Sequence, residues 1–192
     1  MAPQTKGPQQ REARAQVRLF HVSEEPGIEV FKPRWLAHRP ELEPAVWAVD
    51  EARLRNYLLP RECPRVTFYA WIKSSDRDVE TYLDGRREKI VVAVERAWLE
   101  RIEQTTLTLY EMPPEGFDLH DECAGHYRST NTVHPLRRHT RKDLPERVRE
   151  CGAEFRPVQT LWPLFDQIVP STLPFSMIRM RNAQARKPND ET

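Results

Sequence analysis

The sequence predicts an α+β domain built on a mixed, largely antiparallel and bent sheet of short strands with small helices. Strand-like apolar runs recur along the chain, separated by short helical segments in an irregular order. A parallel sheet would require a more regular alternation of strands and helices. Many of the 17 prolines sit at the ends of the expected strands and in connections, where a missing N–H costs least.

The expected strands are rich in β-branched, aromatic or continuous apolar residues, which favour extended structure. They cover residues 17–22, 45–49, 65–71, 89–94, 107–112, 153–157 and 175–181. Residues 28–31 and 126–129 are also predicted to be extended. This set is sufficient for a sheet that fills a single domain.

Helices are expected at residues 51–58, 96–103, 143–151 and 161–169. Asp50 is suited to cap the first of them, because its side chain can accept from a backbone N–H of the first turn. Gly152 follows the third, where glycine tolerates the left-handed conformation that ends many helices. The polar stretch 74–84 predicts a loop with one helical turn, and the basic stretch 137–142 predicts a solvated loop.

The length of 192 residues is typical of one domain, which we expect over residues 17–185. Polar composition predicts disordered tails at residues 1–16 and 186–192. Three cysteines far apart in the chain do not suggest a disulfide framework, and no apolar run is long enough to span a membrane. Together with the polar N-terminal segment, these features favour a cytoplasmic protein.

Charge and composition narrow the classes of function. Lys and Arg number 30 against 29 Asp and Glu, a net charge of +1, which does not indicate a generic nucleic-acid or membrane binder. With only 6 glycines, a glycine-rich phosphate cradle is excluded. The nucleophile motif G-x-S-x-G is absent. A nucleic-acid or protein partner and the oligomeric state stay open.

Two polar stretches allow both a functional and a structural interpretation. His120, Asp121 and His126 could form the zinc site of a hydrolase, but their spacing favours a polar surface loop, and we expect no metal. The basic stretch 137–142 could meet phosphate or a partner, although such runs are more often solvated.

His21 is the most distinctive candidate for a binding role. It lies near the end of the first expected strand and is followed at once by a turn that contains Ser23. Rigid scaffolds present polar groups at strand ends, so the imidazole and the Ser23 hydroxyl could contact a small ligand. The structural alternative is a half-buried histidine that bonds a backbone carbonyl.

The strings LFHVSEEPGIEVFKPR, VWAVDEARLRNYLLPRECPRVTFYA and SMIRMRNA resemble a bacterial family of uncharacterised proteins (DUF6886). The resemblance extends from about Arg18 to Ala183. It implies a shared fold but no established activity.

A fold-level resemblance to ADP-ribosyltransferases rests on the first-strand histidine and the V-W-A-V-D string. It implies NAD as the ligand. By this resemblance His21 contacts the ribose, Trp47 stacks on nicotinamide, and Glu111 acts at the reacting sugar. Trp47 stands where tyrosine is usual, and Glu111 is not in a diagnostic motif.

Three further residues complete the hypothetical nucleotide site. Arg34 or Arg65 could hold a pyrophosphate through a bidentate contact, or each could be a surface ion-pair partner. Tyr127 could line a cleft. The alternative function is a non-catalytic binding module that uses a strand edge or the basic loop 137–142. The environment of His21 discriminates between the two, because an enzyme needs Trp47 and a carboxylate within reach of it.

Overall fold

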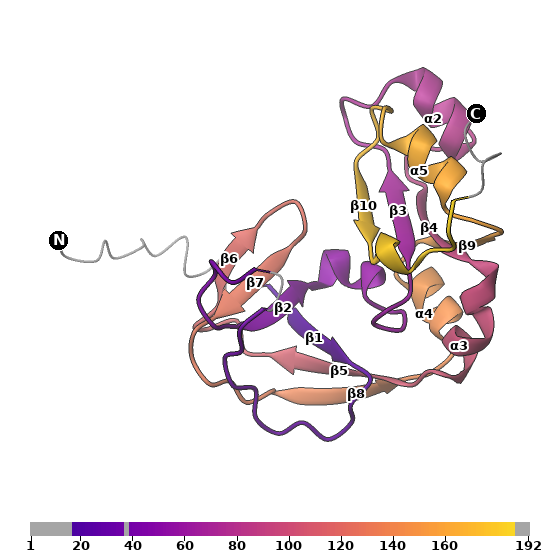
Figure 1. Cartoon of the computed structure of the whole chain (residues 1–192). Helices are drawn as coiled ribbons and strands as arrows, with labels where there is room; N and C mark the ends of the chain where they lie inside the picture. Colours follow the sequence, from indigo (N-terminus) through magenta and orange to yellow (C-terminus); the bar gives the residue numbers. More distant parts are fainter. Residues whose placement is uncertain (1–16, 37–38, 187–192) are drawn as a thin grey trace. The chain divides into compact units, whose positions relative to one another are not determined.

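The computed structural model describes residues 17–36 and 39–186. Within these residues, ten short strands form two sheets connected by small helices (Figure 1). The pairs β1–β2, β1–β5, β2–β7, β6–β7, β3–β4 and β3–β10 are antiparallel, and the pair β4–β9 is parallel. The predicted α+β class with a mixed, largely antiparallel arrangement is therefore confirmed. The predicted tail 1–16 and most of 186–192 lie outside the described residues.

The contacts of the chain divide it into two compact units. Unit 1 contains residues 1–54 and 108–140, and unit 2 contains residues 55–107 and 141–192. Each has its own sheet and its own apolar cluster. The sequence indicates one sheet, since a strand pattern does not reveal which strand is its partner. The single domain over residues 17–185 stays a prediction.

The sheet of unit 1 has the order β6-β7-β2-β1-β5-β8. Its strands are β1 (Leu19–Ser23), β2 (Val46–Asp50), β5 (Leu107–Met112), β6 (Asp118–Asp121), β7 (His126–Ser129) and β8 (Arg137–Arg141). β1 lies inside the sheet and pairs antiparallel with both neighbours, so that Phe20 is opposite Val49 on one side and Glu111 on the other.

This register sorts the side chains of unit 1 between two faces, because successive residues of a strand point to opposite sides. Leu19, Val46, Ala48, Tyr110 and Met112 share one face and are buried. Phe31, Phe117 and Val133, from connecting segments, complete the cluster. This face of the sheet is therefore the apolar core of unit 1.

The sheet of unit 2 has the order β10-β3-β4-β9. Its strands are β10 (Phe175–Ile178), β3 (Arg65–Tyr69), β4 (Ile90–Glu95) and β9 (Glu154–Val158). β3 pairs antiparallel with β10 and β4, and β9 runs parallel to β4. Helices connect the strands, namely η1 (Glu51–Asn56), α2 (Asp76–Leu83), η2 (Arg96–Trp98), α3 (Leu99–Gln104), α4 (Leu144–Glu150), α5 (Trp162–Ile168) and η3 (Met180–Asn182).

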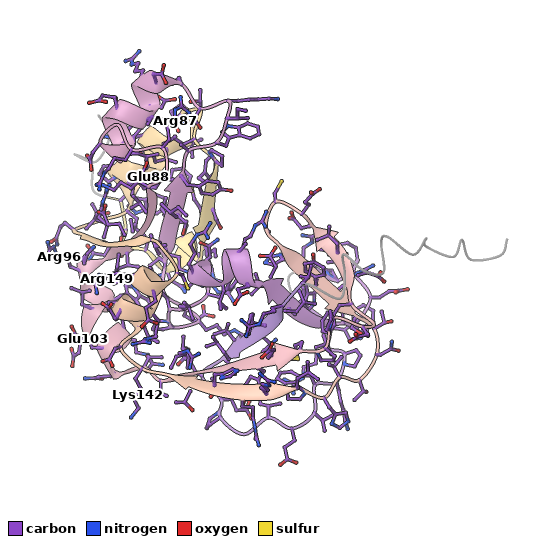
Figure 2. All side chains as sticks on the ribbon, turned by 180° about the vertical axis from the view of Figure 1, so that it is seen from behind. Arg87, Glu88, Arg96, Glu103, Lys142 and Arg149 are labelled. Carbon is purple, nitrogen blue, oxygen red and sulfur yellow. The ribbon has the colours of Figure 1, made fainter. Side chains whose placement is uncertain are left out.

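The core of unit 2 forms where α2 and α5 meet one face of this sheet. Its buried residues include Val66 and Phe68 of β3, Val79 and Leu83 of α2, and Leu161 beside α5. Many charged side chains of unit 2 are exposed, although Glu95 and Arg65 are buried. Those labelled in Figure 2 are exposed and include both signs, among them Arg96 of η2, Glu103 of α3 and Arg149 of α4.

The structure corrects the prediction of a loop with one helical turn at residues 74–84, because the eight-residue helix α2 forms there. Ser75 caps the helix, because its hydroxyl accepts from the N–H of Asp78 at 3.2 Å. Val79 and Leu83, four residues apart, are the buried side chains of this helix. A helix with only two buried positions in a polar stretch shows little hydrophobic periodicity in its sequence. Its capping residue is then the main indication that a helix forms.

The prediction of a loop at residues 137–142 is also wrong, because Arg137–Arg141 form β8. The N–H of Leu136 donates to the carbonyl of Glu111 at 2.7 Å, immediately before this strand. β6 was not predicted either. Both are polar strands at the ends of the sheet, where period-2 apolar patterning is weak. The expected extended piece 28–31 contains only one bridge, from Phe31 to Val133.

Two predicted helix boundaries are confirmed. The Asp50 carboxylate accepts from the N–H of Arg53 at 2.8 Å and so caps η1. Gly152 follows α4 with a φ of +75°, and its N–H donates to the carbonyl of Arg149 at 2.8 Å. Both residues act through local geometry, which sequence alone can indicate.

A buried carboxylate at the end of β4 fastens two later segments of unit 2. Glu95 has an exposed fraction of 0%, and its Oε1 accepts from the N–H of Leu161 at 3.2 Å. Both of its oxygens accept from the N–H of Gln184, at 3.3 and 3.0 Å. The start of α5 and the segment after η3 are thereby held to the same strand.

Replacement Glu95→Ala should lower the free energy of unfolding by about 3 kcal/mol, because it leaves buried N–H groups without their charged acceptor. Urea unfolding followed by circular dichroism measures the change. The matched control is Glu100→Ala on the exposed side of α3. A loss no larger than that of the control would contradict the fastening role.

Candidate functional site

His21 lies in the middle of β1 and is half-buried. Its Nδ1 is 2.8 Å from the carbonyl oxygen of Trp47 on β2. Because a carbonyl can only accept, this contact places the proton on Nδ1. In the neutral ring Nε2 is then the acceptor nitrogen. The structural alternative, a half-buried histidine that bonds a backbone carbonyl, is thus present in full, and the bond also orients the imidazole.

Aromatic residues surround the imidazole on the core face of unit 1. The ring of Phe31 lies 4.8 Å from that of His21, and the ring of Tyr110 lies 5.1 Å from that of Phe31. The buried Tyr110 hydroxyl donates to the carbonyl of Glu25 at 2.8 Å and accepts from the N–H of Ile28 at 2.9 Å. Tyr110 therefore holds the turn after β1 beside His21.

Sequence reasoning missed Phe31 and Tyr110 as neighbours of His21. Tyr110 is directly opposite His21 in the β1–β5 pair. Its strand was predicted, and period-2 alternation within that strand separates Tyr110 from Glu111. The missing information was the partner strand. For Phe31 the signal was weaker, since it bridges Val133 from an otherwise irregular segment.

The β-sheet register brings two other predicted residues to the face of His21. Tyr127 is opposite Ala48 in the β2–β7 pair, and the β1–β2 register makes Ala48 the neighbour of His21. Ser23, two residues after His21, points to the same side of β1. Its hydroxyl accepts from the N–H of Glu25 at 3.0 Å. His21, Ser23 and Tyr127 thus share the core face of unit 1, where Tyr127 packs against the apolar cluster.

The Trp47 ring points away from this group, because Trp47 precedes Ala48 in β2 and so faces the opposite side of the sheet. There it meets His120 edge-on, with ring centres 5.0 Å apart, and His126 at 6.3 Å. Its Nε1 is buried without a hydrogen-bond partner among the described atoms. The structure therefore does not bring the Trp47 ring and His21 to one ligand.

The hairpin of β6 and β7 is tied to the end of β2. Arg53 donates to the Asp50 carboxylate and to the carbonyl of Glu122, both at 3.0 Å. Gly125 has a φ of +64°, and a Cβ there would lie 2.6 Å from Asp50. Burial lowers the pKa of His126, which favours its neutral form. This hairpin places His120 and His126 against Trp47.

No group of three His, Cys, Asp or Glu side chains within the described residues is placed to hold a metal ion. This finding includes His120, Asp121 and His126, the residues of the alternative zinc site. The rings of His120 and His126 meet Trp47, and the Asp121 carboxylate accepts from the N–H of Ala124 at 3.0 Å.

Glu111 shares the face of Trp47, since it is opposite Phe20 in β1. Its side chain is 13% exposed, and Oε1 accepts from Arg18 Nε at 3.1 Å. Oε2 lies 3.6 Å from His139 Nε2 on β8. The hydrogen bond from Arg18 lowers the pKa of Glu111. The carboxylate is therefore held in an ionic group on the side of the sheet opposite His21.

The two candidate phosphate ligands differ in their surroundings. Arg34 in unit 1 is exposed, and its backbone pairs with Ala45. Arg65 belongs to unit 2 and is only 2% exposed. Its Nη1 donates to the carbonyls of Pro60 at 3.1 Å and Cys63 at 2.9 Å. The alternative of a surface ion pair is wrong for Arg65.

One family model matches residues 20–183, and it describes a family of unknown function (DUF6886). The chain belongs to this family. The resemblance that the sequence strings indicate is thereby confirmed for the family, and the family carries no described activity. The resemblance to ADP-ribosyltransferases and the bacterial origin stay predictions.

Neither the comparison with curated proteins nor that with solved structures gave a match. Across the described part of the chain, no helix has the length and apolar character needed to cross a membrane. The cytoplasmic location stays a prediction. A function for this chain must therefore be inferred from the geometry of its own structure.

The ionic group around Glu111 gives a pH-dependent prediction. Glu111→Gln should lower the free energy of unfolding at pH 7 by about 1 kcal/mol, because it removes the charge that Arg18 contacts. Since the folded-state pKa of Glu111 lies below its ordinary value of 4.5, its contribution is present above that value. The difference between variant and wild type should vanish as the pH falls through the folded-state pKa.

Urea unfolding at a series of pH values from 7 down to 3 would measure this difference. Glu115→Gln is the control, because Glu115 is exposed in the same unit. A difference that is constant over this range would contradict an ionic role for Glu111.

Proposed function

We propose that this protein binds a nucleotide of the NAD type through unit 1, as an ADP-ribosyltransferase-like protein. The observation that carries the proposal is the bond from His21 Nδ1 to the carbonyl of Trp47, at 2.8 Å. It orients the ring and makes Nε2 an acceptor, which is suited to a ribose hydroxyl that donates.

In this proposal Tyr127, and not Trp47, stacks on the nicotinamide ring. Tyr127, Ala48 and His21 lie in one row across β7, β2 and β1. Adjacent strands are about 4.8 Å apart, which puts the Cα atoms of His21 and Tyr127 about 10 Å apart. The small Ala48 side chain separates them. Trp47 contributes its backbone carbonyl, and its ring supports the β6–β7 hairpin.

Ser23 and Arg34 complete the proposed site, and the proposal is restricted to binding. Ser23 presents a hydroxyl on the face of His21, and the exposed Arg34 offers a guanidinium for phosphate. Glu111, the carboxylate suggested for the reacting sugar, is on the opposite face in contact with Arg18. We therefore assign Glu111 to stability and make no assignment of a transfer step.

Isothermal titration with NAD tests the proposal. Wild-type protein should bind, and His21→Asn should bind about tenfold more weakly, the effect of about 1.4 kcal/mol expected for one hydrogen bond. Asparagine keeps an N–H donor toward the Trp47 carbonyl but has no counterpart of Nε2. His134→Ala, at an exposed position of unit 1, should leave affinity unchanged.

No heat at millimolar NAD, with the protein shown to be folded by circular dichroism, would refute the proposal. So would equal affinities of His21→Asn and wild type. Release of nicotinamide would be a separate observation, and it would require another carboxylate than Glu111.

A second function is favoured by the finding that the basic stretch forms β8. This strand ends the order of the sheet that the described residues form, and Arg137 and Arg138 are exposed. Edge strands can pair with an added extended segment, and arginines favour an acidic one. The second candidate is therefore a module that binds an acidic extended peptide.

Fluorescence anisotropy with a labelled acidic peptide tests this candidate. Affinity should fall as salt increases, and Arg138→Glu should lower it about tenfold or more through charge reversal. Lys32→Glu, at another exposed position of unit 1, should cause a smaller change. Equal effects of the two reversals would indicate nonspecific attraction and refute the candidate.

A further inference from the structure

Two segments far apart in the sequence meet around one carboxylate in unit 2. The Nδ2 of Asn182 donates to the carbonyl of Glu62 at 2.7 Å and to its Oε2 at 2.9 Å. Arg179 Nε lies 3.4 Å from Oε1, and Arg181 Nη2 lies 3.4 Å from Oε2. Two guanidinium groups and an amide therefore converge on the side chain of Glu62.

A third guanidinium belongs to the same neighbourhood. Arg65 begins β3 and is paired with Ile178, the residue before Arg179. Its Nε is buried and has no hydrogen-bond partner among the described atoms. Within the described residues, no carboxylate lies within ion-pair distance of Arg65. Its Nη1 donates to two backbone carbonyls, but these do not balance the buried charge, and buried charges are normally paired.

The electrostatic surroundings agree with this geometry. Burial lowers the pKa of Arg65 to about 10, and the charge of Arg179 contributes in the same direction. Thr67, on the same side of β3, also has a buried hydroxyl oxygen without a partner in the described residues. The carboxylate of Glu95 is also nearby, since both it and Arg65 influence the pKa of Cys63, in opposite directions. Its oxygens, however, accept from the N–H groups of Leu161 and Gln184.

The Glu62 carboxylate has the features of an internal substitute for an anionic ligand. It is 49% exposed, so a ligand from solvent can replace it. The hydrogen bond from Asn182 and the nearby arginines lower its pKa, which keeps it ionised. Arginines present parallel N–H donors that match phosphate oxygens as well as carboxylate oxygens.

We propose that Arg65, Arg179, Arg181 and Asn182, here called the arginine cluster, form a phosphate-binding site that Glu62 occupies when no ligand is bound. The ligand class is inorganic phosphate or the phosphate of a nucleotide. The site lies in unit 2 and does not depend on the proposed role of His21. It uses side chains from two segments, without a glycine-rich loop.

Glu62→Gln gives the sharpest test, because it removes the competing charge and keeps the amide contacts. Titration calorimetry with inorganic phosphate at constant ionic strength should show about tenfold tighter binding than in the wild type. Unchanged or weaker phosphate binding in Glu62→Gln would overturn the proposal.

A second pair of variants tests the donors. Arg181→Gln should weaken phosphate binding about tenfold. The control is Arg149→Gln (Figure 2), since Arg149 is also an exposed arginine that contacts a glutamate, Glu146, at 3.1 Å. Equal losses in both variants would overturn the proposal by showing general attraction. Arg65→Met removes the buried charge while retaining bulk, and in folded protein it should abolish binding.

Adenosine diphosphate in place of phosphate distinguishes the two sources of the ligand. Tighter binding of the nucleotide would assign the site to nucleotide phosphates, and equal binding would assign it to free phosphate. His21→Asn should not change phosphate affinity, so failure of the His21 proposal and failure of this one are distinguishable.

Discussion

The antiparallel pairing of β1 with both β2 and β5 is the constraint on which the arrangement of unit 1 depends. It sets Phe20 opposite Val49 and Glu111, and thereby assigns every side chain of three strands to a face. A shift of one residue would exchange the two faces and expose Leu19 and Tyr110. The buried cluster that includes these residues fixes the register, and the register in turn separates His21 from Trp47 and Glu111.

Much of the local structure could be predicted from the sequence. Continuous apolar runs identify β4, alternation identifies β5, and Asp50 and Gly152 mark helix ends. The misses, α2, β6 and β8, are polar elements whose positions depend on a cap or on a neighbouring strand. The division into two sheets could not be predicted, because pairing between distant segments leaves no periodic signal.

The candidate site was predictable in its residue types but not in its geometry. His21, Ser23 and Tyr127 share a face because of the strand partners, which sequence does not reveal. Arg65 appeared as one of many charged residues, whereas its burial follows from its place at the start of a strand inside the sheet. The Glu62 contacts join residues about 120 positions apart, beyond any local pattern.

The interleaving of the two units has a consequence for the order in which the chain can fold. Residues 55–107 of unit 2 are separated from residues 141–192 by a part of unit 1. β4 cannot pair with β9, nor Glu95 with Gln184, until the chain has returned from unit 1. During synthesis, β3 and β4 can pair with each other, but their outer edges stay unpaired until β9 and β10 have been made. Such long-range closure slows folding and leaves strand edges open to association until the later strands have been made.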